Sequence, residues 1–181
     1  MTPTAEEKII LGSGKVYTAE FTGTIPADAT LEDEDNLLGA ISGGASIEYK
    51  PEFYKAEDDA QTVSKVILTK EDVSLKCGVM TWCGTTLAKL SSTARVTEAA
   101  GKRTVKIGGI DNQNGKKYVI RFVHKDAEHG DVRVTIVGQN EAGFTLAFAK
   151  DKETVIDAEF KAHPLDSEGT KVIYEESIPV V

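Results

Sequence analysis

Cysteine is scarce in this chain of 181 residues, since Cys77 and Cys83 are the only two. Two cysteines do not make a disulfide framework, so the composition favours folding in a reducing cytosol. Apolar runs are short, and none approaches the ~20 residues that a helix needs to span a bilayer. The opening residues, MTPTAEEKII, contain neither a basic n-region nor an apolar h-region. We therefore expect no membrane span and no secretion signal.

The chain also lacks an excess of positive charge. Its 21 Lys and Arg residues are outnumbered by 29 Asp and Glu residues, which gives a formal net charge of −8. A chain of this charge repels the phosphates of nucleic acids. The longest basic runs are the pairs Lys102-Arg103 and Lys116-Lys117, which are typical of solvated strand ends. Specific nucleic-acid binding is therefore not predicted.

Motifs for phosphate and calcium binding are incomplete. Residues 12–15 (GSGK) resemble the end of a phosphate loop, but the loop needs a glycine where Ile9 stands. Residues 33–36 (DEDN) resemble the start of a calcium loop, but EF-hand spacing needs glycine at Leu38 and glutamate at Gly44. A flexible strand connection and a solvated acidic connection are the better interpretations.

Candidate metal ligands and nucleophiles form no recognisable pattern either. His124, His129 and His163 lie far apart, and Cys77 and Cys83 do not have zinc-ribbon spacing. We interpret His124 as a strand-end residue and Cys77 as a small buried hydrophobe. No nucleophile elbow is present, although a Ser or Cys nucleophile with a distant His base stays open. We predict no catalytic residue, no cofactor and no metal site, and therefore not an enzyme.

All of the net charge lies in one stretch, residues 22–62. This stretch contains ten acids and two bases, a net of −8, whereas the remainder balances at 19 bases and 19 acids. A neutral body with an acidic arm indicates a part that fits against another molecule, and it is not typical of an enzyme cleft.

The middle and the end of the chain alternate between apolar and polar residues. The apolar positions are Val105 and Ile107; Tyr118, Ile120 and Phe122; Val132, Val134 and Ile136; Phe144, Leu146 and Phe148; and Ile156, Ala158, Phe160 and Ala162. A last strand is expected near residues 171–175, and Asn114-Gly115 indicates a hairpin turn. Period-2 alternation separated by turns predicts a mainly β fold, an antiparallel β-sandwich or barrel with one face buried.

The first half of the chain differs. After a strand over residues 16–21, residues 22–42 are expected to form a long, loosely structured acidic connection. Residues 45–68 are expected to form a projecting β-hairpin arm, apolar near its base and acidic at its tip, residues 55–62. Pro51 places the first strand of this arm at an edge or free of the sheet, because proline cannot donate to a ladder.

One short α-helix is expected to flank the sheet, near residues 81–91. Cys83, Leu87 and Leu90 recur at helical spacing, and the threonine at the start can cap the helix. Trp82, the only tryptophan, is expected to anchor the helix to the sheet, with a role at a subunit interface as the alternative.

Several segments, taken in order, resemble those of one protein family. They are residues 11–17 (LGSGKVY), 36–39 (NLLG), 41–49 (ISGGASIEY), 148–162 (FAKDKETVIDAEFKA) and 166–170 (DSEGT). Together they make the chain similar to the major tail (tail tube) proteins of long-tailed bacteriophages. The match extends over nearly the whole chain, which is therefore expected to be a single tail-tube domain, residues 1–181.

The resemblance implies a β-sandwich flanked by a helix, related to the tubes of contractile tails and of type VI secretion systems. It implies hexameric rings that stack into a hollow conduit for genome delivery, with a long hairpin reaching into the neighbouring ring. The implied partners are further copies of this chain, the tape measure and tail terminator proteins, and double-stranded DNA that passes through without specific binding. The implied location is the virion tail, after assembly in the host cytoplasm, with no membrane.

By matching position, the tip of the arm would contact the adjacent ring. The predicted contact residues are Tyr54, Lys55, Glu57, Asp58, Asp59 and Gln61. Two alternatives stay open. One is a monomeric β-sandwich binding module, such as a tail adhesin or a carbohydrate-binding accessory domain, which would expose an aromatic platform. The other is the tube protein of a phage-tail-like bacteriocin or injection system.

Overall fold

The computed structural model describes residues 12–127 and 130–178. In chain order its elements are β1 (Lys15–Glu20), α1 (Asp28–Leu31), the 3-10 helix η1 (Glu34–Asn36), β2 (Leu37–Gly39), β3 (Ile41–Glu57), β4 (Ser64–Val79), α2 (Gly84–Lys89), β5 (Arg95–Ala99), β6 (Lys102–Lys106), the 3-10 helix η2 (Ile110–Asn112), β7 (Tyr118–His124), β8 (Val132–Asn140), β9 (Ile156–Ala162) and β10 (Val172–Glu176). The strands pair antiparallel, which confirms the prediction of a mainly β, antiparallel fold.

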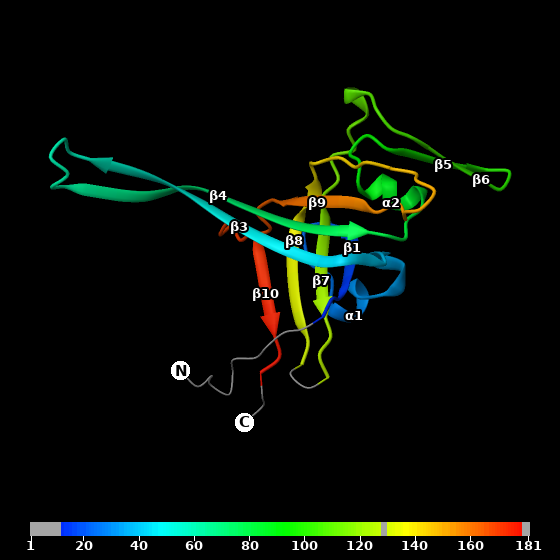
Figure 1. The fold of residues 1–181 in the computed structure, drawn as a ribbon, viewed down its shortest axis with the longest axis horizontal. Helices are drawn as coiled ribbons and strands as arrows, with labels where there is room; N and C mark the ends of the chain where they lie inside the picture. Colours follow the sequence, from blue (N-terminus) through cyan, green and yellow to red (C-terminus); the bar gives the residue numbers. More distant parts are fainter. Residues whose placement is uncertain (1–11, 128–129, 179–181) are drawn as a thin grey trace.

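The main sheet curves back towards its own start. Its strand order is β2-β1-β7-β8-β9-β4-β3, with β10 paired to β8. β2 and β3 stand at opposite ends of this order, yet only Ala40 separates them in the chain. Backbone bonds hold this junction, since Met80 N donates to Ala40 O at 2.7 Å. We call the curved sheet and its covering helices the body (Figure 1).

The concave side of the sheet holds the main core. Its buried residues include Leu75, Ile120, Ile136, Ile156 and Phe160, each at most 1% exposed. These positions belong to the alternating runs, because residues on one face of a strand recur at every second position. The apolar alternation of β7, β8 and β9 therefore faces the core as predicted.

Helix α1 covers the opposite face of the sheet. Leu31 is fully buried there against Val119 and Val137. The expectation of a loosely structured connection over residues 22–42 is therefore wrong, because the segment contains α1, η1 and β2 and packs on the sheet. Its acidic side chains bind arginines that lie about a hundred positions later in the chain, and the local sequence does not show those partners.

Two predicted strand features are absent from the described residues. Residues 144–148 form no strand, although Phe144 and Leu146 still pack against the core from an irregular segment. Asn114-Gly115 is not a hairpin turn, because β6 pairs with β5 and not with β7. The turn of that small hairpin is Ala100-Gly101, where both residues have positive φ, 51° and 72°.

The predicted helix is present as α2, but the prediction of a single helix is wrong because α1 exists as well. Its N-cap is Cys83 and not Thr81, whose hydroxyl instead accepts a bond from the Ala40 backbone N–H at 2.7 Å. Trp82 packs against the core beside Leu87 and donates its indole N–H to Thr154 O at 3.2 Å. Trp82 therefore links the start of α2 to the body.

The hairpin expected at residues 45–68 corresponds to β3 and β4, which run further than expected at both ends. Pro51 lies in β3, and β3 is an edge strand, as proline at this position predicts. In Figure 1 the hairpin extends far beyond the body on one side. Within the described residues, no helix is both long enough and apolar enough to cross a membrane.

Candidate assembly surface

The outer part of the long hairpin is a free-standing two-stranded ribbon. β4 pairs with β9 only over residues 74–79. Beyond that point, the strand partners of residues 48–73 all lie within the β3–β4 hairpin of the described chain, and we call residues 48–73 the arm. A two-stranded ribbon is marginal in water on its own, and its open edges invite pairing with another chain. The geometry of the arm therefore leaves its strand edges open to a partner.

One face of the arm continues the core face of the body. Residues paired directly across two strands share a face, so the pair Tyr49 and Val73 lies on the same side as the core. Further out, Phe53 pairs with Leu68 on this side, because a register shift after Glu52 keeps the apolar positions aligned. We call this side the apolar arm face. Its apolar residues are Tyr49, Pro51, Phe53, Val66 and Leu68, and the charged Glu71 and Lys55 lie on the same side, opposite Pro51 and Val66.

The apolar arm face is exposed. Phe53 is 61% exposed, Val66 55% and Leu68 46%, whereas Val73 at the base is 2% exposed. A contiguous apolar patch on a projecting ribbon marks an interaction site. The apolar residues therefore continue from the base of the arm almost to the polar tip at residues 55–62.

The opposite face carries paired charges. Lys50 binds Glu48 at 3.0 Å, and Lys70 binds Asp72 at 2.6 Å. Glu52 also lies 3.7 Å from Lys70. Such exposed pairs contribute little to stability, so this ladder keeps the face solvated more than it stabilises the ribbon. The inner part of the arm is thus amphipathic, whereas further out both faces carry exposed apolar side chains, Phe53 and Leu68 on one and Tyr54 and Ile67 on the other.

The turn at the tip depends on Asp58. Its carboxylate accepts hydrogen bonds from the Thr62 hydroxyl, the Thr62 N–H and the Val63 N–H at 2.6 to 2.7 Å. These bonds, that of the Thr62 hydroxyl first, lower the pKa of Asp58. Gln61 takes a left-handed conformation with φ 54° in the same turn. Asp58 therefore shapes the tip.

The six predicted contact residues surround this tip, but they differ in their surroundings. Lys55 and Glu57 form an ion pair, and Tyr54 is 59% exposed on the charged face. Asp59 and Gln61 project from the exposed turn. Their contact with another molecule stays a prediction. Phe53 and Leu68 are not among the predicted contact residues, although the period-2 alternation of both strands indicates that they lie on one face.

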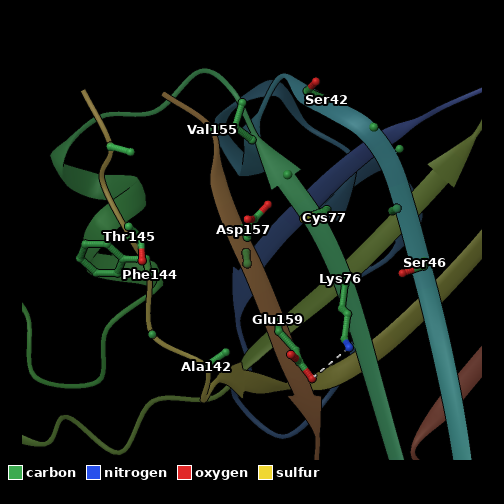
Figure 2. Close-up of a pocket in the computed structure, with 17 residues that line it drawn as sticks. Ser42, Ser46, Lys76, Cys77, Ala142, Phe144, Thr145, Val155, Asp157 and Glu159 are labelled. Carbon is green, nitrogen blue, oxygen red and sulfur yellow. Dashed lines mark ion pairs between the residues drawn. The ribbon is translucent and has the colours of Figure 1, made fainter. Parts of the chain in front are cut away.

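A groove lies at the base of the arm, with a volume of about 730 Å³. Figure 2 shows it between β3, β4 and β9 on one side and the irregular segment that carries Phe144 on the other. Its charged lining includes Lys76 and Glu159, which form an ion pair at 3.6 Å. Within the described residues, no cluster of His, Cys, Asp and Glu could hold a metal ion.

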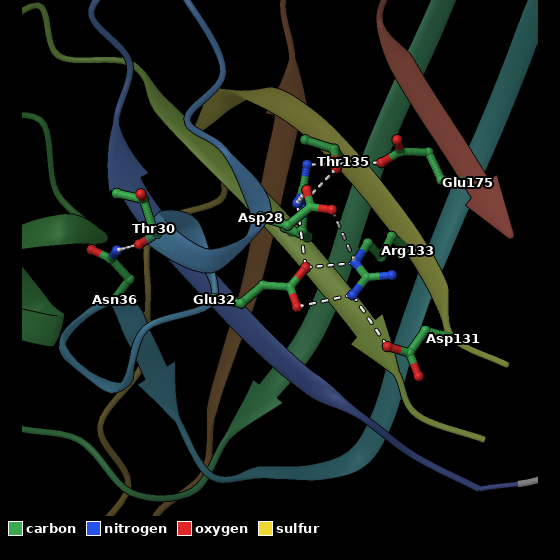
Figure 3. Close-up of polar contacts among 9 residues, drawn as sticks. Asp28, Thr30, Glu32, Asn36, Asp131, Arg133, Thr135 and Glu175 are labelled. Carbon is green, nitrogen blue, oxygen red and sulfur yellow. Dashed lines mark hydrogen bonds and ion pairs between the residues drawn. The ribbon is translucent and has the colours of Figure 1, made fainter. Parts of the chain in front are cut away.

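A second polar cluster fixes α1 to the outer face of the sheet (Figure 3). Arg133 donates to Glu32 at 2.6 Å and to Asp131 at 3.1 Å. Arg121, whose side chain is 4% exposed, lies between Glu32 and Asp28. Burial acts to raise the pKa of Glu32, but the hydrogen bonds from both arginines outweigh it and lower the pKa. We call this arrangement the clamp, because it holds α1 on the sheet. Its acids on the α1 side, Asp28 and Glu32, lie in the segment that the sequence predicts to be a loose connection.

The two cysteines have opposite surroundings. Cys77 is buried in the core, as predicted, and burial raises its pKa to about 12. Cys83 is exposed, and hydrogen bonds from the Thr85 hydroxyl and then from the Thr86 N–H lower its pKa to about 7.

No protein-family model matches the chain, and no curated protein matches it either.

Proposed function

We propose that this chain is a structural subunit of a bacteriophage tail tube, which forms hexameric rings that stack into a hollow conduit for genome delivery. The observation that carries the proposal is the exposed apolar arm face. Phe53 and Leu68 are 61% and 46% exposed on a ribbon that has no partner strand. A second copy that covers this face removes the apolar side chains from water and occupies the open edges.

The placement of the arm supports a head-to-tail contact. The arm projects to one side of the body, so a copy that receives it presents a different surface and offers its own arm onward (Figure 1). Contacts between unlike surfaces generate rings where the rotation closes and open stacks where it does not. A tube needs both kinds of contact, and the resemblance to tail tube proteins supplies the stoichiometry of six.

The charge of the chain suits a conduit for DNA. A duplex carries one negative charge per ~1.7 Å of its axis, and a basic wall would retain it by counterion release. A subunit with a net charge of −8 offers no such retention. DNA is therefore expected to slide through the tube without specific binding.

The aromatic pair of Trp82 and Phe148 does not favour a carbohydrate-binding module. Phe148 is 78% exposed, and its ring lies 6.3 Å from that of Trp82 at an angle of 55°. Trp82 is half-buried and held by its bond to Thr154 O. The tilted pair therefore presents no flat platform on which a sugar ring could stack.

Electron microscopy of the concentrated protein tests the proposal. We expect rings or tubes with a central channel in negative stain, and sedimentation of particles much larger than one subunit. A matched variant, Phe53→Ser with Leu68→Ser, should remain monomeric under the same conditions. The proposal is overturned if the unaltered protein stays monomeric at every salt and protein concentration tested.

A further inference from the structure

The body carries a second projecting ribbon, formed by β5 and β6. These strands pair only with each other and make a sheet separate from the main one. In Figure 1 they extend from the end of the molecule that lies opposite the arm. A molecule with two unlike ribbons at opposite ends is suited to a head-to-tail contact between them.

The two faces of this small hairpin have different roles. Val96 and Val105 share one face, together with the pair Glu98 and Arg103, which are joined by an ion pair at 2.5 Å. This face packs on α2, because a Cβ added at Gly84 would lie 2.8 Å from Val105. All acidic charge on the hairpin is therefore on the packed side.

The other face is exposed and purely basic. By register, Arg95 pairs with Lys106, and Ala99 pairs with Lys102, so all three cations lie on the face away from α2. All three side chains are exposed. We call Arg95, Lys102 and Lys106 the basic hairpin face. Residues 95–106 contain four bases and one acid, a net of +3.

The arm has the opposite charge. Residues 48–73 contain seven acids and four bases, a net of −3. The ion pairs of the charged face use much of this charge, but Asp59 at the tip adds to an acidic turn beside Asp58. The excess negative charge is therefore available where the arm reaches furthest from the body.

We propose that the acidic tip of the arm docks on the basic hairpin face of another copy of this chain. The proposal rests on the proposed function, because it specifies which surface of a neighbouring subunit receives the arm. The equal and opposite charges of the two ribbons supply long-range attraction and select the correct end of the neighbour. The apolar arm face then adds the short-range contact, which charge alone does not provide.

Duplex DNA is the competing ligand for a basic surface. Three cations on a short ribbon give few phosphate contacts, and the chain as a whole carries −8. The arm of another copy adds apolar side chains to its local negative charge, so its contact with the hairpin does not depend on charge alone. The experiment below therefore also measures whether duplex DNA binds the protein.

Charge reversal tests the docking. The arm variant Glu57→Lys with Asp59→Lys changes residues 48–73 from −3 to +1, and the hairpin variant Lys102→Glu with Lys106→Glu changes residues 95–106 from +3 to −1. Each variant alone should need at least a tenfold higher concentration to assemble, as measured by sedimentation. The control matched to the hairpin variant, Lys150→Glu with Lys152→Glu, makes the same charge change on an exposed loop and should assemble as the unaltered protein does.

Mixing the two variants provides the decisive result. In the mixture, the reversed arm of one variant faces the reversed hairpin of the other variant. The equimolar mixture should therefore assemble at concentrations at which neither variant assembles alone. Circular dichroism of each variant should match that of the unaltered protein. The docking is overturned if the variants assemble normally alone, if their mixture stays unassembled, or if duplex DNA binds the unaltered protein and not the hairpin variant.

Failure of the docking and failure of the proposed function give different results. If the unaltered protein forms rings or tubes and the hairpin variant does too, the arm contacts another surface and the tube function stands. If the unaltered protein never assembles, the tube function fails first.

Discussion

The two halves of the β3–β4 hairpin follow the same pattern and have opposite surroundings. At the base, Val73 and Leu75 are 2% and 1% exposed, because β9 and the curved sheet close over them. Further along the same strands, Phe53 and Leu68 are 61% and 46% exposed. On β3 the alternation of apolar residues continues past the point where the body ends, whereas on β4 it resumes at Leu68 after Glu71 and a register shift. The comparison teaches that the same hairpin buries apolar side chains in the body and leaves others exposed on the arm, which is why we propose that another copy covers them.

The largest expected effect separates a phenylalanine of the body from one of the arm. Phe160 is fully buried, so Phe160→Ala should reduce the free energy of unfolding by about 4 kcal/mol. Phe53→Ala should change it by less than about 0.5 kcal/mol, because the ring is already exposed. Urea titration of the unassembled subunit measures both values. A loss of several kcal/mol in Phe53→Ala would show that the arm is covered within its own subunit.

A second prediction concerns the clamp that holds α1 on the body, which the arm lacks. Glu32→Gln should cost about 2 kcal/mol at pH 7, because it leaves hydrogen-bonded arginines without their carboxylate. The folded-state pKa of Glu32 lies below its usual 4.5, so its contribution is present above pH 4.5 and is lost as the pH falls through the folded value. Unfolding curves of the two proteins should therefore converge in acid. A constant difference down to pH 2 would contradict the assignment.

A smaller effect distinguishes neighbouring acids at the tip. Asp58→Ala removes the acceptor of three hydrogen bonds and should loosen the turn locally, seen as faster amide exchange at Val63. Asp59→Ala, the matched control, should leave that exchange unchanged. Equal exchange rates in both variants would remove Asp58 from the structure of the turn.

The smallest expected effect on stability concerns the two cysteines, which differ clearly in their expected reactivity. Cys83, with a pKa of about 7, should react with a thiol reagent at pH 8 within the folded protein, whereas Cys77, with a pKa of about 12, should react only on unfolding. Mass spectrometry with a Cys83→Ser control identifies the labelled residue. Labelling of folded Cys83→Ser protein would show that the core opens at Cys77.

The sequence correctly predicts the strands whose alternating apolar residues are buried by pairing within the main sheet. β7, β8 and β9 each bury the residues that alternate, and Pro51 correctly indicates an edge strand. Residues 144–148 show the limit of this argument, because Phe144 and Leu146 reach the core without a partner strand. The local sequence pattern alone cannot distinguish an alternating apolar run that is buried as a paired strand from one that is buried in an irregular segment.

The candidate surface was predictable in position and less so in chemistry. The acidic excess locates the arm, but not which acids act within the fold. Glu32 binds Arg133, which is 101 positions away, and Asp58 binds the turn that follows it. Only tertiary geometry assigns the first acid to a clamp and the second to a turn. The basic hairpin face likewise depends on a strand register that the pair Lys102-Arg103 does not reveal.

The continuity of β2 and β3 through Ala40 has a mechanical consequence. A pull on the arm along its length is transmitted to the body through strands that remain paired from Ile41 and Val79 outwards. β4 is also paired with β9 over residues 74–79, so the load falls on many hydrogen bonds in parallel, in shear. Bonds loaded in shear must break together, whereas bonds loaded from one end break in sequence. A subunit built in this way resists tension along the arm without needing a large core in the arm itself.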